Sequence, residues 1–590
     1  MNSQIKTEWD LKQFYNSPDD PNIEKDIKKA DKLFSAFEKK YKNSDFTKNE
    51  NTLLQALNDF EKISALPISK PILYLSYAQT LNSSDEVVRA RLNLASQAFS
   101  KISNKIVFFD VRLSKVDKKI QKKFLSSKKL SKFNYLLKKT FESGKYTLSE
   151  PEEKILTLKS ITSRGLWEDL TDKLLHKLTV SHNGKEMPIS EAMALSSESL
   201  SRDEREVVHK KCMQALSTIA EIAEGEINAI VTDKKINDEL RGYKEPYDAT
   251  ILGYENDRKS VLNMTEIVTK KFNVSQKFYQ VKAKMMGISK LGYFDRAARI
   301  GSSEKSIPFD EAYQVLSRVF GSVSIQYKNI LEKMAENGQI DAFPKIGKAG
   351  GAFCSGDNGS PTMVMLNHTN NFHSLMTFAH EMGHAIHTEL SKSQPSFYQH
   401  YSTSTAEVAS TLFESFAFYD ALERMSEDEK IIALHDKISD DISTIFRQIA
   451  CFNFEAEMHR EIREKGNLSK EELSGLMNKH MKSYLGDAVE LEKEDGLFFV
   501  SWSHIRNMFY VYTYAFGQLA SKALYEKYSE DKRYIEKINK FLSLGGSMSP
   551  EAIFKSIGID VKKSEFWIKG IESIEKDINK LEKLVENKKL

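Results

Sequence analysis

The sequence predicts a mostly α-helical protein with a small β-sheet beside one of its helices. The 590 residues include only 12 prolines, and long stretches place apolar residues three and four positions apart between charged ones, which is the amphipathic helix pattern. Glycine concentrates between residues 338 and 361, just before a short apolar run. This glycine-rich segment predicts extended backbone and tight turns, and therefore the place of the sheet.

Amphipathic helices are predicted near both ends of the chain. Residues 23–41 carry one apolar stripe, formed by Ile27, Ala30, Leu33, Phe34 and Phe37. Residues 566–585 follow a similar pattern, which is too short to require a coiled coil. Between them, residues 362–367 form an apolar run bounded by turn formers, which favours a strand over a helix.

A chain of this length is larger than one typical hydrophobic core, so several domains are possible. A single large helical body with two lobes is also compatible with this length. No internal repeat or low-complexity linker marks a boundary. We predict a division near residue 195, into a helical region 1–195 and a second region 196–590.

Composition argues against several classes of function. The 86 basic and 83 acidic residues leave a net charge of +3, so no strong field recruits nucleic acid or an acidic membrane. The lysines of residues 115–139 are interpreted as the solvated faces of amphipathic helices. The amino terminus lacks a secretory apolar stretch, no segment approaches a membrane span, and only three cysteines occur. We expect a soluble, cytoplasmic protein.

The chemistry is concentrated in the predicted helix 371–390. It contains His380, Glu381 and His384 in the pattern HExxH, and residues i and i+4 of a helix lie on one face, so both imidazoles can reach one ion. Zinc with three protein ligands keeps a fourth position for water and lowers the pKa of that water. Glu381, which lies outside the ligand set, is the expected general base.

A third ligand is expected from the polar stripe of residues 407–414. We choose Glu407 as the ligand and Glu414 as an acceptor that orients a histidine, although the reverse assignment stays open. His387 continues the HExxH face and is interpreted as structural or as a residue that supports a metal ligand without binding the ion. Gly383 costs about 1 kcal/mol relative to alanine inside a helix, and a close approach of a facing backbone would explain why it is there.

The segments HEMGHAIH (380–387) and AEVASTLFES (406–415) strongly resemble the M3 peptidases, especially the oligoendopeptidase F branch, relatives of thimet oligopeptidase. Residues 241–249, 340–356 and 504–521 agree with this resemblance, which runs from about residue 200 to the carboxyl terminus. It implies a zincin-like, mostly helical two-lobed body around a deep central channel, with 196–590 as the catalytic domain. It also implies one Zn²⁺ held by His380, His384 and Glu407, with Glu381 as the base.

The same resemblance gives the tyrosine-rich segment 504–521 a role. In the family a histidine and tyrosines of this segment donate hydrogen bonds to the oxyanion, and His504, Tyr510 and Tyr512 match best. On a helix Tyr510 and Tyr514 share a face while Tyr512 points elsewhere, so not all can line the site. We favour Tyr512.

Substrate is expected to pair with main-chain groups beside the sheet. The resemblance implies that Gly350, Gly351, Ala352 and Phe353, with Met365 on the predicted strand, hold an extended peptide by strand addition. Phe353 and Phe509 enter at most as lining residues.

The expected activity is therefore zinc-dependent hydrolysis of internal bonds in short oligopeptides. Release of C-terminal dipeptides on the same site, or a non-catalytic peptide-binding scaffold, are the alternatives. His₂Glu sites also accept cobalt or manganese. No nucleic-acid or membrane partner is expected, and the sequence leaves the oligomeric state open.

Overall fold

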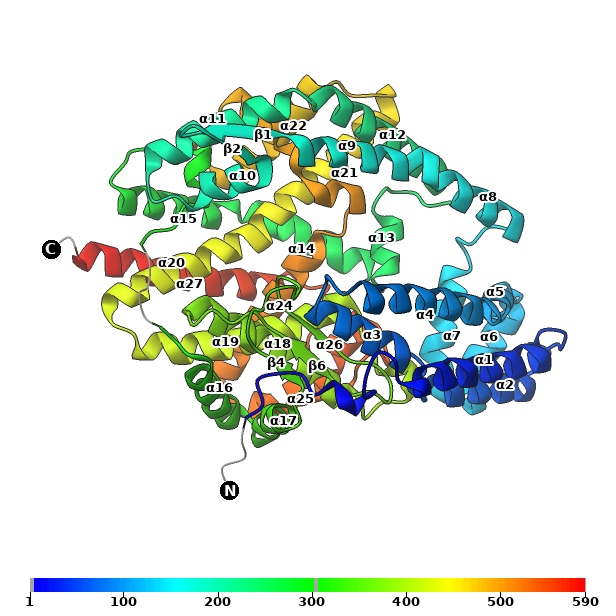
Figure 1. The fold of residues 1–590 in the computed structure, drawn as a ribbon. Coiled ribbons are helices and arrows are strands. Elements are labelled where there is room, and N and C mark those ends of the chain that lie inside the picture. The colour runs from blue at the N-terminus through cyan, green and yellow to red at the C-terminus, as the bar shows by residue number, and fades with distance from the viewer. Residues whose placement is uncertain (1–4, 302–305, 589–590) are drawn as a thin grey trace. The chain divides into compact units, whose positions relative to one another are not determined.

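The protein is described by a computed structural model of residues 5–301 and 306–588. It is mostly helical, as predicted (Figure 1). The chain forms two compact units, each assembled from separate stretches. Unit 1 comprises residues 1–146, 305–420 and 528–558, and unit 2 comprises residues 147–304, 421–527 and 559–590. The predicted division at residue 195, which concerned contiguous regions, stays a prediction.

Unit 1 holds the amino-terminal helices, the HExxH helix and two later helices. Its helices are α1 (Pro21–Tyr41), α2 (Glu50–Ser64), α3 (Lys70–Leu81), α4 (Glu86–Asn104), α5 (Val107–Ser114), α6 (Lys118–Ser126), α7 (Asn134–Ser143), α16 (Phe309–Val323), α17 (Ile325–Glu336), α18 (Phe372–Ser391), α19 (Thr403–Arg424), α25 (Ile535–Ser543) and α26 (Pro550–Ser556). Helix α19 runs four residues past the edge of the unit.

Unit 2 contains the tyrosine-rich segment. Its helices are α8 (Glu150–Ser160), α9 (Leu166–Lys177), α10 (Ile189–Glu198), α11 (Arg202–Ser217), α12 (Ala220–Arg241), α13 (Asp248–Gly253), α14 (Arg258–Lys270), α15 (Phe272–Met286), α20 (Glu427–Asp441), α21 (Gln448–Lys465), α22 (Lys470–Leu485), α23 (Phe498–Ser501), α24 (Tyr512–Glu530) and α27 (Ser564–Lys588).

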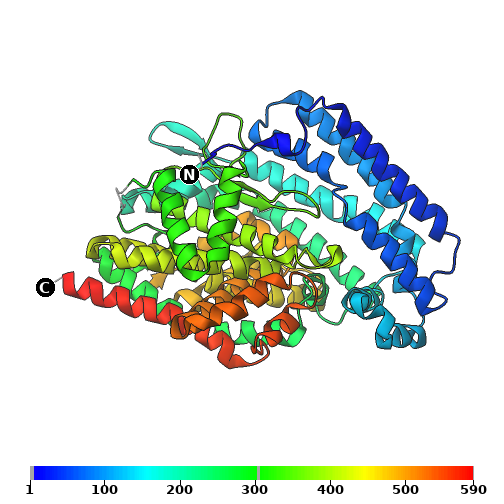
Figure 2. The same cartoon turned by 90° about the horizontal axis from the view of Figure 1, so that it is seen from below.

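The predicted amphipathic stripe of α1 is confirmed. Ile27, Ala30, Phe34 and Phe37 are buried, and Leu33 is partly buried against the same core. This core also contains residues of α2 to α7. The long helices among them, α1 to α4, run alongside one another, and the short helices α5 to α7 gather at one end (Figures 1 and 2). The helices form because one face of each removes apolar surface from water.

The predicted sheet beside the HExxH helix is also confirmed. Strands β4 (Ile340–Asp341), β6 (Met363–Met365) and β5 (Phe353–Ser355) pair in the order β4-β6-β5, with β4 parallel and β5 antiparallel to β6. Both β5 and β6 contact α18, and β6 lies beside it in Figure 1. Two further two-stranded sheets, β1 (Thr179–His182) with β2 (Lys185–Pro188) and β3 (Leu291–Gly292) with β7 (Val489–Glu490), were not predicted.

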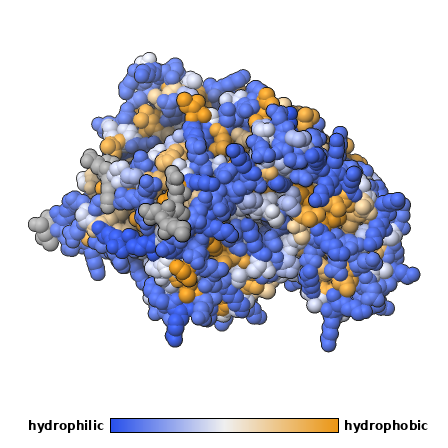
Figure 3. All heavy atoms as spheres, turned by 60° about the horizontal axis from the view of Figure 1, so that its bottom comes forward, coloured by the Kyte–Doolittle hydropathy of each residue, from blue (hydrophilic) through white to orange (hydrophobic). Residues whose placement is uncertain are grey.

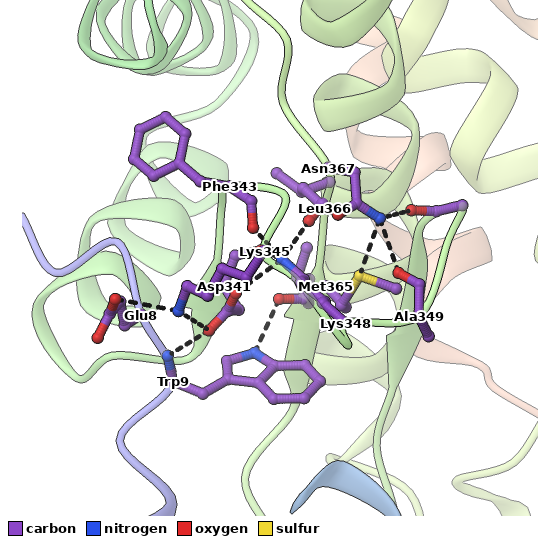
Figure 4. Close-up of polar contacts among 12 residues, drawn as sticks. Glu8, Trp9, Asp341, Phe343, Lys345, Lys348, Ala349, Met365, Leu366 and Asn367 are labelled. Atoms are coloured by element: carbon purple, nitrogen blue, oxygen red, sulfur yellow. Dashed lines mark hydrogen bonds and ion pairs between the residues drawn. The ribbon is translucent and has the colours of Figure 1, made fainter. Parts of the chain in front are cut away.

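The amino-terminal segment is tied to this sheet through Trp9. Its backbone N–H donates to Asp341 Oδ2 at 3.1 Å, and its indole Nε1 donates to the carbonyl of Val364 at 2.8 Å (Figure 4). The ring of Trp9 also packs edge-on against Phe353 with centroids 6.1 Å apart. The sheet therefore depends on contacts that bridge more than 300 residues of chain.

Lys348 anchors the glycine-rich loop to the sheet. Its side chain is fully buried, and its ammonium donates to Asp341 Oδ1 at 2.7 Å, to the carbonyl of Phe343 at 2.7 Å and to that of Leu366 (Figure 4). A buried cation with a carboxylate and two carbonyls around it has its hydrogen bonds satisfied. The loop 343–351 is therefore fixed to β4 and to the end of β6.

No helix within the described ranges 5–301 and 306–588 is long and apolar enough to cross a membrane. The face of the molecule in Figure 3 is mostly hydrophilic, with apolar side chains in scattered groups.

The Lys348→Met variant should unfold more easily than the parent chain. Removing the cation leaves the Asp341 carboxylate, which is 1% exposed, without its closest partner, and breaking a buried ion pair costs about 3 to 5 kcal/mol. Thermal or urea denaturation measures the loss. Lys345→Met is the matched control, because Lys345 is 37% exposed and 3.7 Å from Asp341; an equal loss in both variants would contradict the anchoring role of Lys348.

Candidate active site

The centre of the site is the contact between α18 and α19. Helix α18 begins where predicted, because the Asn371 side chain accepts the N–H of Ser374 at 2.8 Å as a helix cap. A Cβ atom on Gly383 would lie 2.7 Å from the Cα of Ser410 and 3.0 Å from the carbonyl of Ala409. Glycine therefore lets the α19 backbone approach α18, as the sequence led us to expect.

This approach brings the three predicted ligands together. The Nε2 atoms of His380 and His384 lie 3.7 and 3.9 Å from the two carboxylate oxygens of Glu407, and one ligand atom from each residue lies within 4.8 Å of the others. Both of these nitrogen–oxygen distances are below about 4.2 Å, which is twice the length of a zinc–nitrogen bond, so one ion could contact both atoms of each pair. The donor set, two imidazoles and a carboxylate, fits a zinc ion.

The electrostatics of the histidines also suit a cation. Burial lowers the pKa of His384 to about 3, so its ring is neutral and its lone pair available. Burial also lowers the pKa of His380, but the Glu414 and Glu407 carboxylates more than offset this, and the net pKa is raised. His380 Nδ1 lies 3.5 Å from Glu414 Oε2. Glu414 therefore lies within reach of His380, and its role in orienting that ring stays a prediction.

Glu381 lies on the same helix and faces strand β5. Its side chain is buried, at 7% exposure, and the backbone N–H of Cys354 lies near its carboxylate and acts to lower its pKa. Burial, together with the nearby Glu407 carboxylate, raises the pKa of Glu381 to about 7. A carboxyl group with a pKa near neutrality can both accept and return a proton.

His387 has a packing role. Its ring is 1% exposed and stacks on Tyr401 with centroids 3.6 Å apart. The Tyr401 hydroxyl hydrogen-bonds Thr388 Oγ1 at 2.8 Å and donates to the His384 carbonyl at 3.3 Å. Tyr401, which the sequence reasoning missed, thereby braces the carboxyl half of α18.

One edge strand of the three-stranded sheet lies next to the HExxH helix. Strand β6 is central and pairs with β4 and β5 on its two sides, and Met365 itself is fully buried. Its main chain is already paired with Phe353 and Asp341. This differs from our prediction that Met365 would pair with substrate, because a central strand has no unpaired edge. Strand β5, which begins at Phe353, is the edge strand instead.

Gly350 and Gly351 lie immediately before β5 and are exposed. Gly351 adopts φ +77°, a conformation that favours glycine. The Asn367 amide nitrogen donates to the carbonyls of Ala349 and Gly351 at 2.9 and 2.8 Å and closes the loop onto the end of β6 (Figure 4). Gly350, Gly351 and Ala352 thus lead directly into the edge strand, in line with their predicted position.

A polar cavity of about 270 Å³ lies at the carboxyl end of β5. Its lining comes from β5 and the following turn, the end of α18 and residues 399–401. His400 Nε2 lies 3.0 Å from Asp357 Oδ1 on this lining. The hydrogen bond raises the pKa of His400, and although burial alone would raise the pKa of Asp357, hydrogen bonds from His400, Ser69 and the Asn358 N–H lower it.

The tyrosine-rich segment forms a separate cluster in unit 2. His504 Nδ1 and the Tyr510 hydroxyl form a short hydrogen bond, and the Tyr510 and Tyr514 hydroxyls are 3.4 Å apart. Tyr512 lies apart: it is fully buried, and its hydroxyl donates to Asn256 Oδ1 at 2.9 Å. The predicted separation of Tyr512 from the other two tyrosines is therefore confirmed. Tyr510, rather than the favoured Tyr512, shares a hydrogen bond with His504.

Sequence reasoning missed Cys354, whose backbone N–H lies near the Glu381 carboxylate, because a backbone group has no sequence signal. Tyr514, which the helical spacing grouped with Tyr510, has its hydroxyl 3.4 Å from that of Tyr510.

Comparison with known proteins gives a consistent result. The family model of peptidase family M3 matches residues 197–573, and that of oligopeptidase F matches residues 113–179. The chain is 26% identical over 578 residues to the oligoendopeptidase F homolog of Borreliella burgdorferi, covering 94% of each chain. It is 26% identical over 489 residues to oligopeptidase PepF of Bacillus subtilis, covering 80% of this chain and 72% of that one.

Solved structures show the same fold. A crystal structure from Chlamydophila abortus superposes with a TM-score of 0.88 at 22% identity and covers 98% of this chain and 100% of that one. Oligoendopeptidase-F from Enterococcus faecium superposes with a TM-score of 0.68 at 18% identity, with 96% and 98% covered.

The Gly383→Ala variant should lose about 1 to 3 kcal/mol of folding free energy, because the added methyl group meets the α19 backbone. Thermal denaturation measures this loss. Gly475→Ala on α22 is the matched control: a Cβ there meets nothing within 4 Å, so alanine should be neutral or stabilising. Equal stability of the Gly383→Ala variant and the parent would contradict the close approach.

The His400–Asp357 pair should stabilise the fold only in an acidic window. The raised pKa of His400 means that its contribution is complete below about 6.5 and is lost as pH rises through the folded pKa. The lowered pKa of Asp357 means that its contribution is present above about 3.8 and is lost as pH falls. The difference in thermal midpoint between the parent and His400→Gln should therefore peak near pH 5 to 6 and shrink by pH 8; a pH-independent difference would exclude the ion pair.

Proposed function

The chain belongs to peptidase family M3 and is a metalloendopeptidase, and on that premise we propose that it uses zinc to hydrolyse internal bonds of short oligopeptides. One observation carries the proposal: His380, His384 and Glu407 converge from two helices, while Glu381 on the same helix presents a buried carboxylate with a raised pKa. A binding scaffold has no need of such a base.

We propose that His380 and His384 bind the ion through Nε2 and that Glu407 binds it through its carboxylate. When bound, zinc supplies Lewis-acid polarisation of the peptide carbonyl and makes water a stronger acid. Glu414 holds His380 by its Nδ1 side and so fixes which nitrogen faces the ion.

Glu381 is the proposed proton carrier. Its carboxylate accepts a proton from the attacking water and returns it to the nitrogen of the leaving amine. The Cys354 N–H of β5 lies near this carboxylate, and β5 contacts the HExxH helix. The proposed base therefore lies beside the strand on which a peptide substrate would present its bonds.

Substrate is proposed to add to the free edge of β5. Main-chain pairing holds an extended peptide without reading its side chains, so broad specificity follows. Gly350 and Gly351, which precede β5, allow a peptide backbone to come close because they carry no Cβ. Phe353, whose ring packs on Trp9, keeps the strand in place.

His504 and Tyr510 are proposed as donors to the oxyanion that forms when water attacks. A hydroxyl hydrogen-bonded to an imidazole is a suitable donor, and the two share a hydrogen bond in unit 2. Tyr512 is less suited, because its hydroxyl already donates to Asn256. The channel that the family resemblance implies stays a prediction.

Oligopeptides are the proposed partners. A cytoplasmic location is also proposed: Cys212, Cys354 and Cys451 are free thiols, as expected in a reducing compartment.

Glu381→Gln should retain the metal and lose turnover by about 10² to 10⁴-fold. The assay is cleavage of a quenched fluorescent octapeptide, with metal analysis of each variant. Chelation of the parent should abolish cleavage, and zinc should restore it. Glu389→Gln is the matched control, because Glu389 lies on the same helix and bonds Thr362 and Lys392 instead.

The fragments distinguish the cleavage modes. Mass spectrometry should show cuts at internal bonds; release of C-terminal dipeptides alone would replace endopeptidase action by dipeptidyl-carboxypeptidase action. Full activity of Glu381→Gln would remove Glu381 from the chemistry. Absence of hydrolysis by the zinc-loaded parent would favour a peptide-binding scaffold.

A further inference from the structure

The turn that precedes helix α24 has a strained backbone. Met508 and Phe509 adopt φ +28° and +65°, two successive non-glycine residues in the left-handed region. L-amino acids adopt this region at a cost in free energy, and such residues persist only where the surroundings hold them. The turn sits between His504 and Tyr510, so its shape decides whether these two side chains meet.

Glu455, on the neighbouring helix α21, holds this turn. Its side chain is fully buried, and both of its carboxylate oxygens accept the backbone N–H of Phe509, at 3.0 and 3.1 Å. Within residues 5–301 and 306–588 no lysine, arginine or histidine lies within ion-pair distance of Glu455. Burial raises the pKa of Glu455 to about 8, although the Phe509 N–H acts to lower it. A carboxyl group buried with one backbone N–H as its hydrogen-bond partner is an expensive arrangement if it only fills space.

Other contacts fix the two sides of the turn but not the Phe509 amide. Thr250 Oγ1 donates to the carbonyl of Met508 at 3.0 Å, and the Phe509 ring packs against Phe452 and His459 with centroids 5.6 and 4.7 Å apart. The amide itself points at Glu455. This hydrogen bond therefore selects the left-handed conformation at Phe509, because rotation to negative φ would turn the N–H away from a buried acceptor.

The residue that follows the turn is Tyr510. Its hydroxyl forms the short hydrogen bond with His504 and lies 3.4 Å from that of Tyr514. The ring centroids of His504 and Tyr510 are 5.4 Å apart. A change in φ at Phe509 swings the direction of the Tyr510 side chain, because the two residues are adjacent in the chain, and would separate this pair.

We propose that Glu455 is a positioning residue, which clamps the left-handed turn at Phe509 and thereby presents Tyr510 and His504 as one hydrogen-bonded unit. The inference rests on the proposed function of this pair as oxyanion donors. Glu455 itself does not touch substrate in this scheme; it acts through Tyr510.

The central variant is Glu455→Leu, which removes the acceptor and keeps a side chain of similar bulk. Loss of a correctly placed donor affects the transition state more than substrate binding, so kcat on the octapeptide should fall about 10- to 100-fold with KM within about twofold. Glu455→Gln keeps one carbonyl acceptor and should fall less. If the leucine variant does not fold, the glutamine variant carries the comparison.

The matched control is Asp441→Asn. Asp441 is equally buried in unit 2, but its partners are the side chains of Lys437, Lys522 and Gln518. The Asp441→Asn variant should lose stability and keep kcat.

Met508→Gly tests the backbone strain itself. Because glycine adopts the left-handed region freely, Met508→Gly in the Glu455→Leu background should recover part of the lost kcat.

A double-variant comparison shows whether Glu455 acts through Tyr510. If it does, Glu455→Leu combined with Tyr510→Phe should have the kcat of Tyr510→Phe alone, because the clamp has nothing left to position. Three outcomes would each overturn the inference. The first is a double variant whose loss of kcat equals the product of the two single losses. The others are a wild-type kcat in Glu455→Leu and an equal fall of kcat in Asp441→Asn.

Hydrogen exchange of residues 506–512 separates this inference from the proposed function. Exchange there should speed up at least about tenfold in Glu455→Leu and not in Asp441→Asn, since opening of the turn becomes easier. If the parent chain shows no zinc-dependent hydrolysis but this exchange difference appears, the proposed function fails and the clamp stands. Unchanged exchange would overturn the clamp itself.

Discussion

The close approach of α18 and α19 at Gly383 is the contact on which the candidate site depends. Two histidines one turn apart can face one ion on any regular helix, but the proposed third ligand, Glu407, lies on another helix and must be brought within bonding reach. The absence of a side chain at residue 383 lets the backbone at Ala409 and Ser410 come within 3 Å of the place where a Cβ would be. Glu407, one turn before them, then lies opposite both imidazoles.

The small sheet adds the second component of the site. Strand β5 is one of its two edge strands, and the Cys354 N–H of that strand lies near the Glu381 carboxylate. The position of β5 is fixed in turn by Lys348, buried with Asp341, and by Trp9. The proposed proton transfer and the proposed peptide docking would thus meet beside one strand, whose surroundings are held by a few buried polar contacts.

The geometry of the tyrosine-rich segment has a different physical origin from that of the residues on α18 and α19. Its geometry is held by a strained turn and a buried carboxyl group, whereas the proposed metal ligands lie on ordinary helices. Strain of this kind is concentrated at functional sites. A strained turn can present a side chain in a direction that no helix or strand offers, which is a physical reason for a buried Glu455 next to the cluster of His504 and Tyr510.

The sequence by itself determined the helical fold and the strand before the HExxH helix, because each depends on spacing within one element. It also proposed His380, Glu381 and His384 from a motif, and Glu407 and Glu414 from a polar stripe on a second helix. Whether these side chains meet was decided by the packing of α19 on α18. Tertiary structure decided what depends on contacts distant in sequence. Met365 proved to be on a central strand, so its main chain is occupied, and Tyr510 rather than Tyr512 met His504. Pairing order and the φ of Phe509 are set by partners that lie from tens to hundreds of residues away in the sequence, and local pattern carries no record of them.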